Sequence, residues 1–471
     1  MKHYPFRPNA RLKALVGKFE RMRQKKTPFA LKKSEILLLV DYYDSEKIPD
    51  KAIEVIDYGI AQFHESAELQ VRKTRLFIYN HHHQYAKKLL NRQQFLSLNI
   101  SQVRLLRLEL LISEGKIEKA LSNIAALKEE YASSKKILSE IFYLEALAYE
   151  KSNRFTESFD ALCEVLWIAP EHQDALGKVW MTTEISRKSK DSIVLNSYLL
   201  QKEHYSALTW FNLGHAYYSE AEYKKSMEAL EFCIIINEDF KAAYFDVVEV
   251  CTLLGLHQKA TQYLKEAIER FEIDEIVPFM QYGEALIKCG DFRMARKTLK
   301  DAQLIDPSDP DLLFLIGETH RLEKNWKAAI PYYELILEEE DYRDDVFHIL
   351  GGVFFLNAEY DKAEQHFERA IELDDNCATY RSTLASFYLS IGDKKSAEEV
   401  LSEAVTDLEN VTLEYHYAAI LLILGKNKKG MDVLNNALQK DFESYESLYE
   451  FAPTLVYNQR VQTIINYYQG E

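Results

Sequence analysis

The sequence predicts an all-α chain made of repeated helix pairs, and two observations lead to this fold class. Only 15 Gly and 10 Pro occur in 471 residues, whereas hydrophobic residues make up 47% and charged residues 28% of the chain. Such a composition offers little of the turn chemistry that a many-stranded sheet needs and ample material for amphipathic helices. In addition, a pattern of aromatic, small and large apolar residues recurs at steps of 34 or 35 residues. A repeat of this period predicts a solenoid.

The segments from Thr209 and from Val346 set the register of the repeat. In each, an aromatic residue is followed three and four residues later by Leu-Gly and then by a second aromatic residue. Small and large apolar residues then alternate at helical spacing. The best-matched units begin at Ala207, Lys241, Ile276, Pro310, Asp344 and Ala378.

This pattern resembles the tetratricopeptide repeat, whose consensus is W-x2-L-G-x2-Y followed by A-x3-F. The resemblance implies an all-α, right-handed superhelix (solenoid) of about twelve helix-turn-helix units that binds proteins and supplies no catalytic residues. Over Thr209–Asp246 the chain also resembles cytoplasmic tetratricopeptide-repeat proteins of Bacteroidota-type bacteria. That likeness implies a bacterial scaffold located in the cytoplasm.

The repeat register divides the chain into four predicted segments. Residues 1–32 form a basic amphipathic segment, residues 33–138 hold divergent units, residues 139–444 hold the regular units, and residues 445–471 form capping helices. Within the third segment, residues 207–407 match best and residues 173–206 are degenerate. The remaining units are expected to begin at Lys33, Ala67, Ser101, Ser139, Gln173 and Val411.

The small residues of the pattern have a packing role in this prediction. A Gly such as Gly214 or Gly351 in the first helix lets the two helices of a unit approach closely, and an Ala such as Ala363 in the second helix lets the next unit pack against it. Each helix pair alone leaves an apolar face exposed and gains stability only by stacking. Nearly every residue of the pattern is therefore expected in the core.

The fifth and ninth residues of each first helix are the candidate partner-binding positions, because in this family they generally face the concave groove. The fifth positions of the better-matched units are mostly aromatic or apolar, and three consecutive ninth positions are Glu. An apolar and basic segment of a partner would fit such a groove. The alternative is that the rings pack against the next unit and the glutamates are merely solvated. The candidate residues are Phe211, His215, Phe245, Glu249, Met280, Glu284, Phe314, Glu318 and Arg321.

The N-terminal segment is strongly basic, although the chain as a whole carries −16. Residues 1–33 hold eleven Lys or Arg and one acid, a balance of +10 that leaves −26 on the remainder. The acidic body is not expected to bind nucleic acid. Apolar residues from Leu12 to Met22 follow helical spacing, with Asn9 as a possible cap. Three roles stay open: a cap on the first unit, contact of residues 1–30 with a membrane surface or RNA, and a transit peptide.

Several other functions find no support in the sequence. The chain contains no glycine-rich phosphate loop, GxSxG or HExxH motif, and His81, His82 and His83 lie near a turn without further ligands at metal spacing. We therefore expect no enzyme, cofactor or metal. Asn212 occupies a possible carboxylate-clamp position but lacks the cations of such a clamp. Five isolated Cys, expected mostly on packed faces, indicate a cytoplasmic protein.

The sequence thus predicts a non-catalytic scaffold that binds a partner segment in its groove. The alternative is a peripheral membrane or envelope-assembly factor anchored by the basic N-terminal helix.

Overall fold

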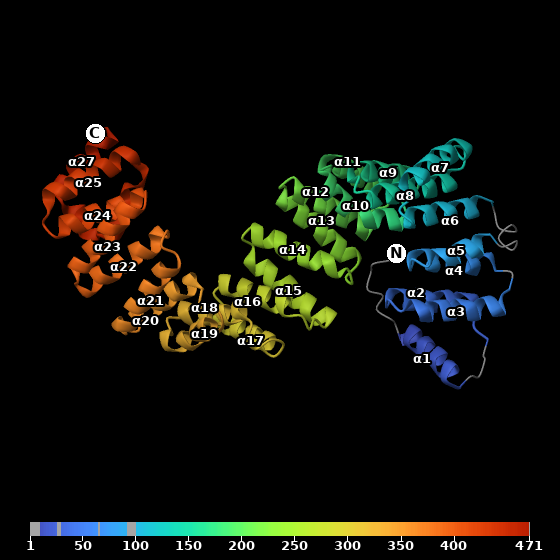
Figure 1. Cartoon of the computed structure of the whole chain (residues 1–471), viewed down its shortest axis with the longest axis horizontal. Coiled ribbons are helices and arrows are strands. Elements are labelled where there is room, and N and C mark those ends of the chain that lie inside the picture. The colour runs from blue at the N-terminus through green and yellow to red at the C-terminus, as the bar shows by residue number, and fades with distance from the viewer. Residues whose placement is uncertain (1–9, 26–29, 65, 92–99, 471) are drawn as a thin grey trace. The chain divides into compact units, whose positions relative to one another are not determined.

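The computed structural model describes residues 10–25, 30–64, 66–91 and 100–470. These residues form 27 α-helices, and no strand occurs among them (Figure 1). They fall into two compact units, unit 1 (Met1–Gly255) and unit 2 (Leu256–Glu471). The structure therefore confirms the all-α fold class.

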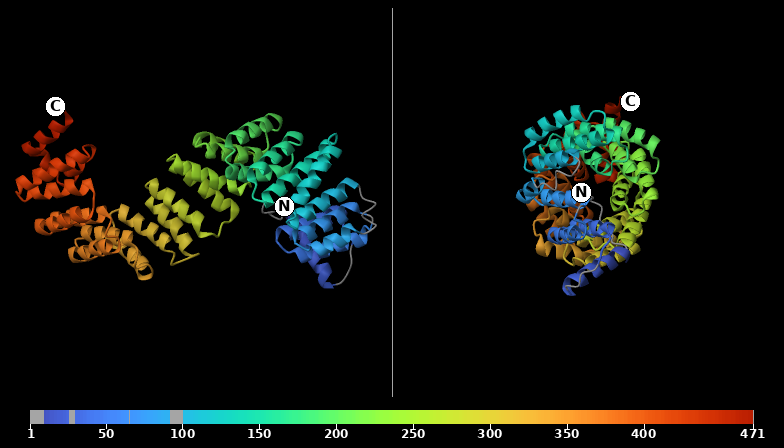
Figure 2. Two further views of the ribbon diagram at one scale, coloured as in Figure 1. Left: turned by 45° about the horizontal axis from the view of Figure 1, so that its top comes forward. Right: turned by 90° about the vertical axis from the view of Figure 1, so that its right-hand side faces the viewer.

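Within each unit, most helices form antiparallel pairs that follow one another along the chain (Figure 2). Helix α14 at the end of unit 1 and α15 at the start of unit 2 hold the first and second positions of one sequence repeat. The first helices of the pairs are α2 (Lys33–Ser45), α4 (Ala67–Tyr79), α6 (Ile100–Ser113), α8 (Lys135–Lys151), α10 (Gln173–Ser186), α12 (Ala207–Ser219), α14 (Lys241–Leu253), α16 (Ile276–Lys288), α18 (Pro310–Leu322), α20 (Asp344–Leu356), α22 (Ala378–Ile391) and α24 (Val411–Ile423). The second helices are α3 (Pro49–Gln62), α5 (His83–Leu90), α7 (Ile117–Glu130), α9 (Phe155–Ile168), α11 (Ser189–Lys202), α13 (Tyr223–Ile236), α15 (His257–Phe271), α17 (Phe292–Gln303), α19 (Trp326–Glu339), α21 (Tyr360–Leu373), α23 (Lys394–Asp407) and α25 (Asn427–Lys440).

The turn inside each pair contains one residue in the left-handed backbone region. This residue is always the fifteenth of its repeat, with φ between 56° and 91°. The same turn occurs in the divergent pairs near the N-terminus, so these pairs share the turn geometry of the regular ones. The residues are Lys47, His81, Gly115, Asn153, Arg187, Ala221, Gly255, Gly290, Lys324, Ala358, Gly392 and Gly425.

Helix α8 begins one turn before the repeat register places it, at Lys135 rather than at Ser139. The spacing between the units from Ser101 and Ser139 exceeds the usual step by four residues. Four residues are close to one helical turn. The insertion therefore lengthens α8 at its N-terminus and leaves the packed part of the pair in register.

Glycines at the eighth position set the distance between the helices of four pairs. At Gly283, an added Cβ would lie only 2.4 Å from Cδ2 of Leu299 on the facing helix. The same contact joins Gly214 to Leu230, Gly317 to Tyr333 and Gly351 to Phe367. Each of these partners is buried, with at most 2% of its surface exposed. The predicted packing role of these glycines is thus what the structure shows.

The pair α10–α11 departs from this arrangement. Trp180 stands where four other pairs have Gly, and its ring lies against His215 of α12, with the ring centroids 5.2 Å apart. Between α10 and α11 the contacts are polar, since Thr183 donates a hydrogen bond of 3.0 Å to Ser192. Helix α10 consequently packs more extensively on α9 and α12 than on α11.

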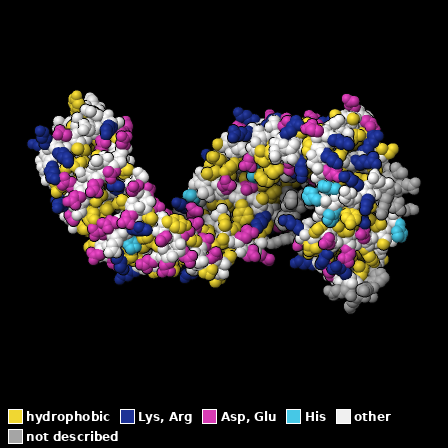
Figure 3. Space-filling model, viewed as in Figure 1, with side chains coloured by type: hydrophobic (Ala, Val, Ile, Leu, Met, Phe, Trp, Pro, Cys, Tyr) yellow, Lys and Arg dark blue, Asp and Glu magenta, His cyan; other side chains and the backbone are white. Residues whose placement is uncertain are grey.

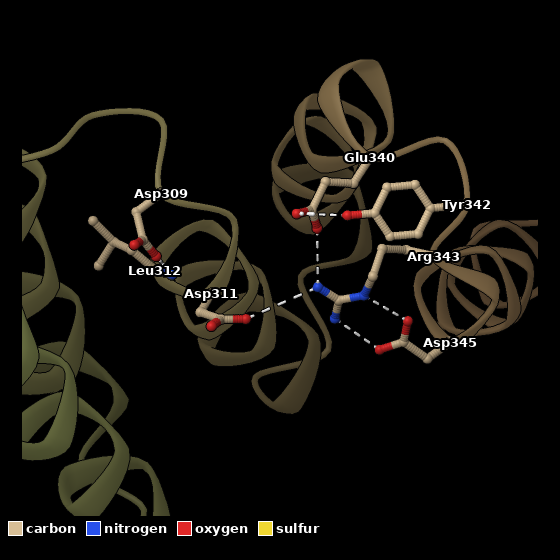
Figure 4. Close-up of polar contacts among 7 residues, drawn as sticks. All are labelled: Asp309, Asp311, Leu312, Glu340, Tyr342, Arg343 and Asp345. Atoms are coloured by element: carbon tan, nitrogen blue, oxygen red, sulfur yellow. Dashed lines mark hydrogen bonds and ion pairs between the residues drawn. The ribbon is translucent and has the colours of Figure 1, made fainter.

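Arg343, in the turn before α20, ties successive pairs of unit 2 together (Figure 4). Its Nε and Nη2 each lie 2.8 Å from a carboxylate oxygen of Asp345, and its Nη1 lies 3.3 Å from Glu340 at the end of α19. A longer ion pair of 3.9 Å reaches Asp311 on α18. The bidentate geometry fixes the guanidinium plane, so the turn holds α19 and α20 in one orientation.

Further helices lie before the first pair and after the last. Helix α1 (Ala10–Lys25) packs Phe19 against the buried side chains of α2 and α3. After α25 come a short 3₁₀ helix (Glu443–Tyr445), α26 (Glu446–Phe451), a second 3₁₀ helix (Pro453–Tyr457) and α27 (Gln459–Gln469). Leu448 and Val461 of this segment are buried in a cluster with Leu434 of α25.

We expect unit 2 to lose stability as the pH falls, because His416 is buried in its neutral form. Its Nδ1 lies 2.7 Å from Ser382 Oγ, its ring stacks on Phe451, and burial lowers its pKa to about 4. The unfolded chain takes up this proton near pH 6.5, whereas the folded chain resists it until about pH 4. Stability should therefore fall by about 2 kcal/mol between pH 7.5 and pH 5.

Urea unfolding at pH 7.5, 6 and 5 measures this effect. His416→Gln should flatten the pH dependence relative to the wild type, while His64→Gln at an exposed position should leave it unchanged. An identical pH dependence in wild type and His416→Gln would contradict the assignment.

Candidate protein-binding surface

The first helices form the more closely packed layer within each unit. They contact one another directly, α4 with α6, α6 with α8 and α10 with α12 in unit 1, and α16 with α18 and α22 with α24 in unit 2. In the parts of the chain that the structure describes, successive second helices make no comparable contact. Each stack therefore curves toward its first helices, and we call this side the inner face.

The predicted site residues fall on the first helices of both units. Phe211 and His215 lie on α12 and Phe245 and Glu249 on α14, all in unit 1. In unit 2, α16 carries Met280 and Glu284, and α18 carries Phe314, Glu318 and Arg321. The structure thus groups the residues into two sets, one in each unit.

The fifth-position side chains differ in how much surface they offer. Phe211 is 5% exposed and packs against Phe240 and His215, with ring centroids 4.7 and 4.6 Å away. Phe245, Met280 and Phe314 are only partly buried. Phe211 therefore behaves as a core residue, whereas the other three present apolar surface.

The ninth-position glutamates are also not equivalent. Glu249 and Glu284 are exposed. Glu249 accepts a hydrogen bond of 2.5 Å from the Tyr218 hydroxyl, which raises the pKa of Tyr218 to about 12. Glu284 makes no ion pair with any described residue. In each of the pairs from Lys241 and Ile276, an exposed carboxylate thus follows a partly exposed apolar side chain by one helical turn.

Glu318 is already neutralised within α18. It accepts bonds of 2.6 and 2.7 Å from Arg321 and one of 2.5 Å from the Tyr333 hydroxyl, and its side chain is 15% exposed. The bonds to Glu318 raise the pKa of Arg321, and burial raises that of Tyr333. Glu318 and Arg321 together form an internal ion pair that leaves little free charge at this position.

The structure also places Asn212 and the three consecutive histidines, His81 to His83. Asn212 is fully buried and donates a hydrogen bond of 2.9 Å to the Leu176 carbonyl, so it is unavailable to clamp a carboxylate. His81 and His82 lie exposed in the turn before α5, while His83 is partly buried and bonded to Ser113 at 2.8 Å. Among the described residues, no group of three or more His, Cys, Asp or Glu could hold a metal ion.

The five cysteines differ in burial. Cys233 and Cys251 are buried, Cys163 and Cys377 are partly buried, and Cys289 is exposed. Cys289 is the C-cap of α16, where the helix ends. Cys289 is therefore an exception to the expectation that most thiols lie on packed faces.

A polar cluster on the inner face of unit 1 was not predicted. Arg75 of α4 binds Glu109 of α6 through Nε at 3.1 and 3.2 Å and through Nη2 at 2.8 Å. Burial raises the pKa values of Tyr79 and Tyr143 nearby. Arg75 and Glu109 are the ninth residues of the units from Ala67 and Ser101. Extending the ninth-position series to the divergent units would have identified this pair.

The distribution of acidic side chains and the hydropathy of the helices further describe the protein surface. On the face shown in Figure 3, Asp and Glu side chains are spread over unit 2, including α20 and α21. None of the helices in the described ranges is long and apolar enough to cross a membrane.

Comparisons with known proteins agree with the repeat. Family models described as tetratricopeptide repeat match residues 207–240, 283–344 and 345–377. TPR repeat-containing protein YpiA of Bacillus subtilis is 19% identical over 367 residues, which cover 69% of this chain and 85% of YpiA. The DnaJ protein P58IPK homolog of Arabidopsis thaliana is 21% identical over 257 residues, 49% of this chain and half of that protein.

Among solved structures, YrrB, described as a TPR protein with an unusual peptide-binding site, is similar at 16% identity and a TM-score of 0.34. The match covers 39% of this chain and 95% of YrrB. The matched family models fall on helix pairs that carry the eighth-position glycines and the left-handed turns described above. Residues 207–240 and 283–377 of this chain are therefore tetratricopeptide repeats.

Proposed function

We propose that this chain is a non-catalytic interaction scaffold that binds a segment of a partner protein on its inner face. Tetratricopeptide-repeat proteins are generally protein-interaction scaffolds, and stacked helix pairs create extended binding surfaces. One observation carries the proposal: Phe245 and Met280 keep apolar surface beside the exposed carboxylates of Glu249 and Glu284. A partner segment with apolar and basic side chains complements both features.

Alanine substitution at Phe245 and Phe314 tests this proposal. Each change should weaken partner capture about tenfold or more, because partly buried rings at a protein interface contribute most of its affinity. The measurement is affinity purification with mass spectrometry from the native host, comparing wild type and variants. A partner set that is unchanged in both variants, with intact helical circular dichroism, would exclude the inner face as the binding surface.

The matched controls lie on second helices. Ile235→Ala on α13 and Leu335→Ala on α19 remove apolar side chains that are 71% and 44% exposed. These two changes should leave partner capture unaltered. A loss of equal size in the controls would place the interaction elsewhere on the chain.

For helix α1 we propose the role of a cap on the first helix pair. Its Leu12 and Phe19 are each 1% exposed, and Leu15, Val16 and Met22 of the same stripe are partly buried against the first pair. Glu20 accepts hydrogen bonds from Tyr43 at 2.8 Å and from Lys51 at 2.6 Å. Arg23 binds Glu54 of α3 at 2.9 Å. Asn9, the expected cap of this helix, lies outside the described residues.

The alternative membrane role concerns residues 1–30, in which Leu12 and Phe19 already use their apolar surface in packing. Fractionation of the native host distinguishes the two roles. Membrane association of the full chain that salt extracts, and that deletion of residues 1–30 abolishes, would support the alternative.

A further inference from the structure

A cleft of about 440 Å³ opens in unit 1 beside the irregular pair α10–α11. It is bounded by the start of α10, the end of α11, the start of α12 and the turn before α14. Its volume lies within the range of small-ligand sites, about 300–1,000 Å³.

The cleft lies beside the pair that departs from the repeat pattern. Asn196 of this pair occupies the position at which four other pairs place Leu, Tyr or Phe against the eighth-position glycine. With small polar side chains between them, α10 and α11 make less contact with each other than with their neighbours.

The walls of the cleft combine an apolar floor with acidic edges. Leu176, Leu199 and Phe240 are buried and form the floor. Glu171 and Glu203 line it as exposed carboxylates, and neither has an ion-pair partner among the described residues. Such walls suit a ligand with an apolar stem and a positively charged end.

Two helix N-termini also face this region, but their backbone donors are already engaged. Ser206 caps α12 by accepting from Thr209 N at 3.3 Å, and His172 caps α10 by accepting from Ala175 N at 3.2 Å. Two full negative charges outweigh the partial positive charges of capped helix ends. The electrostatics therefore favour a cation over an anion.

We propose that this cleft binds an organic cation with N–H donors and an aliphatic stem, supplied by a Lys or Arg side chain of a partner or by a free polyamine. Tyr205 also lines the cleft and is 80% exposed, and an aromatic ring can contact a cation through its face. The site lies apart from Phe245 and does not require the inner face to bind a partner.

Isothermal titration calorimetry at low salt tests the proposal with four probes: Nα-acetyl-arginine amide, Nα-acetyl-lysine amide, Nα-acetyl-citrulline amide and spermidine. We expect the arginine and lysine probes to bind with a Kd of about 0.1–10 mM and the neutral citrulline probe to bind at least about tenfold more weakly. Binding by spermidine alone would assign the site to a free polyamine, with the cation chemistry upheld.

The variants locate the site. The double change Glu171→Gln and Glu203→Gln should raise the Kd about tenfold, whereas Glu184→Gln at an exposed position of α10 outside the cleft should not. Ala207→Trp should block binding by filling the cleft, with folding checked by circular dichroism. Phe245→Ala should keep cation binding, which separates this site from the inner face.

Three results would overturn the proposal. These are equal binding of the citrulline and arginine probes, unchanged binding in the double variant, and no detectable binding of any of the four probes.

Discussion

Replacing Gly351 with Leu should destabilise unit 2 by about 3 kcal/mol, the cost of forcing a large side chain into a closed contact. A Cβ at this position would lie 2.8 and 2.9 Å from two ring carbons of Phe367. Phe367 is 2% exposed and belongs to a buried cluster of unit 2 with Leu350, Phe354 and Phe387, so its ring has little room to move. The gain in helix propensity from removing a Gly, about 1 kcal/mol, is too small to compensate.

Gly352 supplies the matched control one residue further along α20. A Cβ there would meet nothing within 4 Å. Gly352→Leu changes the same helix and the same unfolded segment, so it should be neutral or stabilise by up to about 1 kcal/mol. Urea unfolding, read by circular dichroism and by hydrogen exchange in α20 and α21, measures both variants.

A coupling experiment identifies Phe367 as the cause. Gly351→Leu should cost less in a Phe367→Ala background than in the wild type, because the space left by the ring accepts the new side chain. If Gly351→Leu and Gly352→Leu change the free energy of unfolding equally, helix propensity determines the effect, and the close approach of α20 and α21 does not.

The positions of the helix pairs could be predicted from the sequence because the close contact between two helices requires a small residue at a fixed position of the repeat. Gly214, Gly283, Gly317 and Gly351 stand opposite large side chains, and a Cβ at any of them would lie 3.0 Å or less from the facing side chain. The fifteenth position was not recognised, because the left-handed turn is occupied by residues as different as Lys47, Asn153 and Gly290. Its conformation is imposed by the two helices, and the residue type is free.

The exposure and ion pairing of individual site residues depend on neighbouring side chains that the repeat pattern does not specify. Glu249 and Glu318 share the ninth position, yet only Glu318 is enclosed by Arg321 and Tyr333. Phe211 is buried because Phe240, in the turn before α14, packs against it, whereas Phe245 has no such cover. The exposure of side chains on the inner face can therefore be determined only from the structure, whereas the positions of the helices can be predicted from the sequence.

The pair α10–α11 departs from the repeat pattern, and the structure is needed to see the consequence of that departure. A Trp at the eighth position and an Asn opposite it were visible in the sequence as a degenerate unit. Only the packing shows that Trp180 turns toward α12 and that a cleft remains beside α11.

Replacing Arg75 with Met should destabilise unit 1 by about 3 kcal/mol at neutral pH, since it leaves the Glu109 carboxylate buried without its partner. The Glu109 side chain is 5% exposed, and three hydrogen bonds from Arg75 compensate its charge. The pair joins α4 to α6, so its loss should loosen the stacking of two successive helix pairs.

The pH dependence of this variant follows from the direction of the pKa shift. Burial already raises the pKa of Glu109 above its ordinary value, against the opposing effect of Arg75. Without Arg75 the pKa rises further, and a carboxyl whose folded pKa exceeds its unfolded value is most favourable at low pH. The destabilisation of Arg75→Met should therefore be smaller at pH 5 than at pH 8.

Two further variants separate charge from packing. The double change Arg75→Met and Glu109→Met should recover most of the lost stability, because apolar side chains of similar volume replace a buried ion pair at little cost. Arg107→Met at an exposed position of α6 should change stability by less than about 0.5 kcal/mol. Urea unfolding combined with hydrogen exchange in α4 and α6 reports the local effect in a chain whose helix pairs unfold with limited cooperativity. A double variant as unstable as Arg75→Met would show that Arg75 stabilises unit 1 by packing, and that the charge of Glu109 is tolerated without a partner.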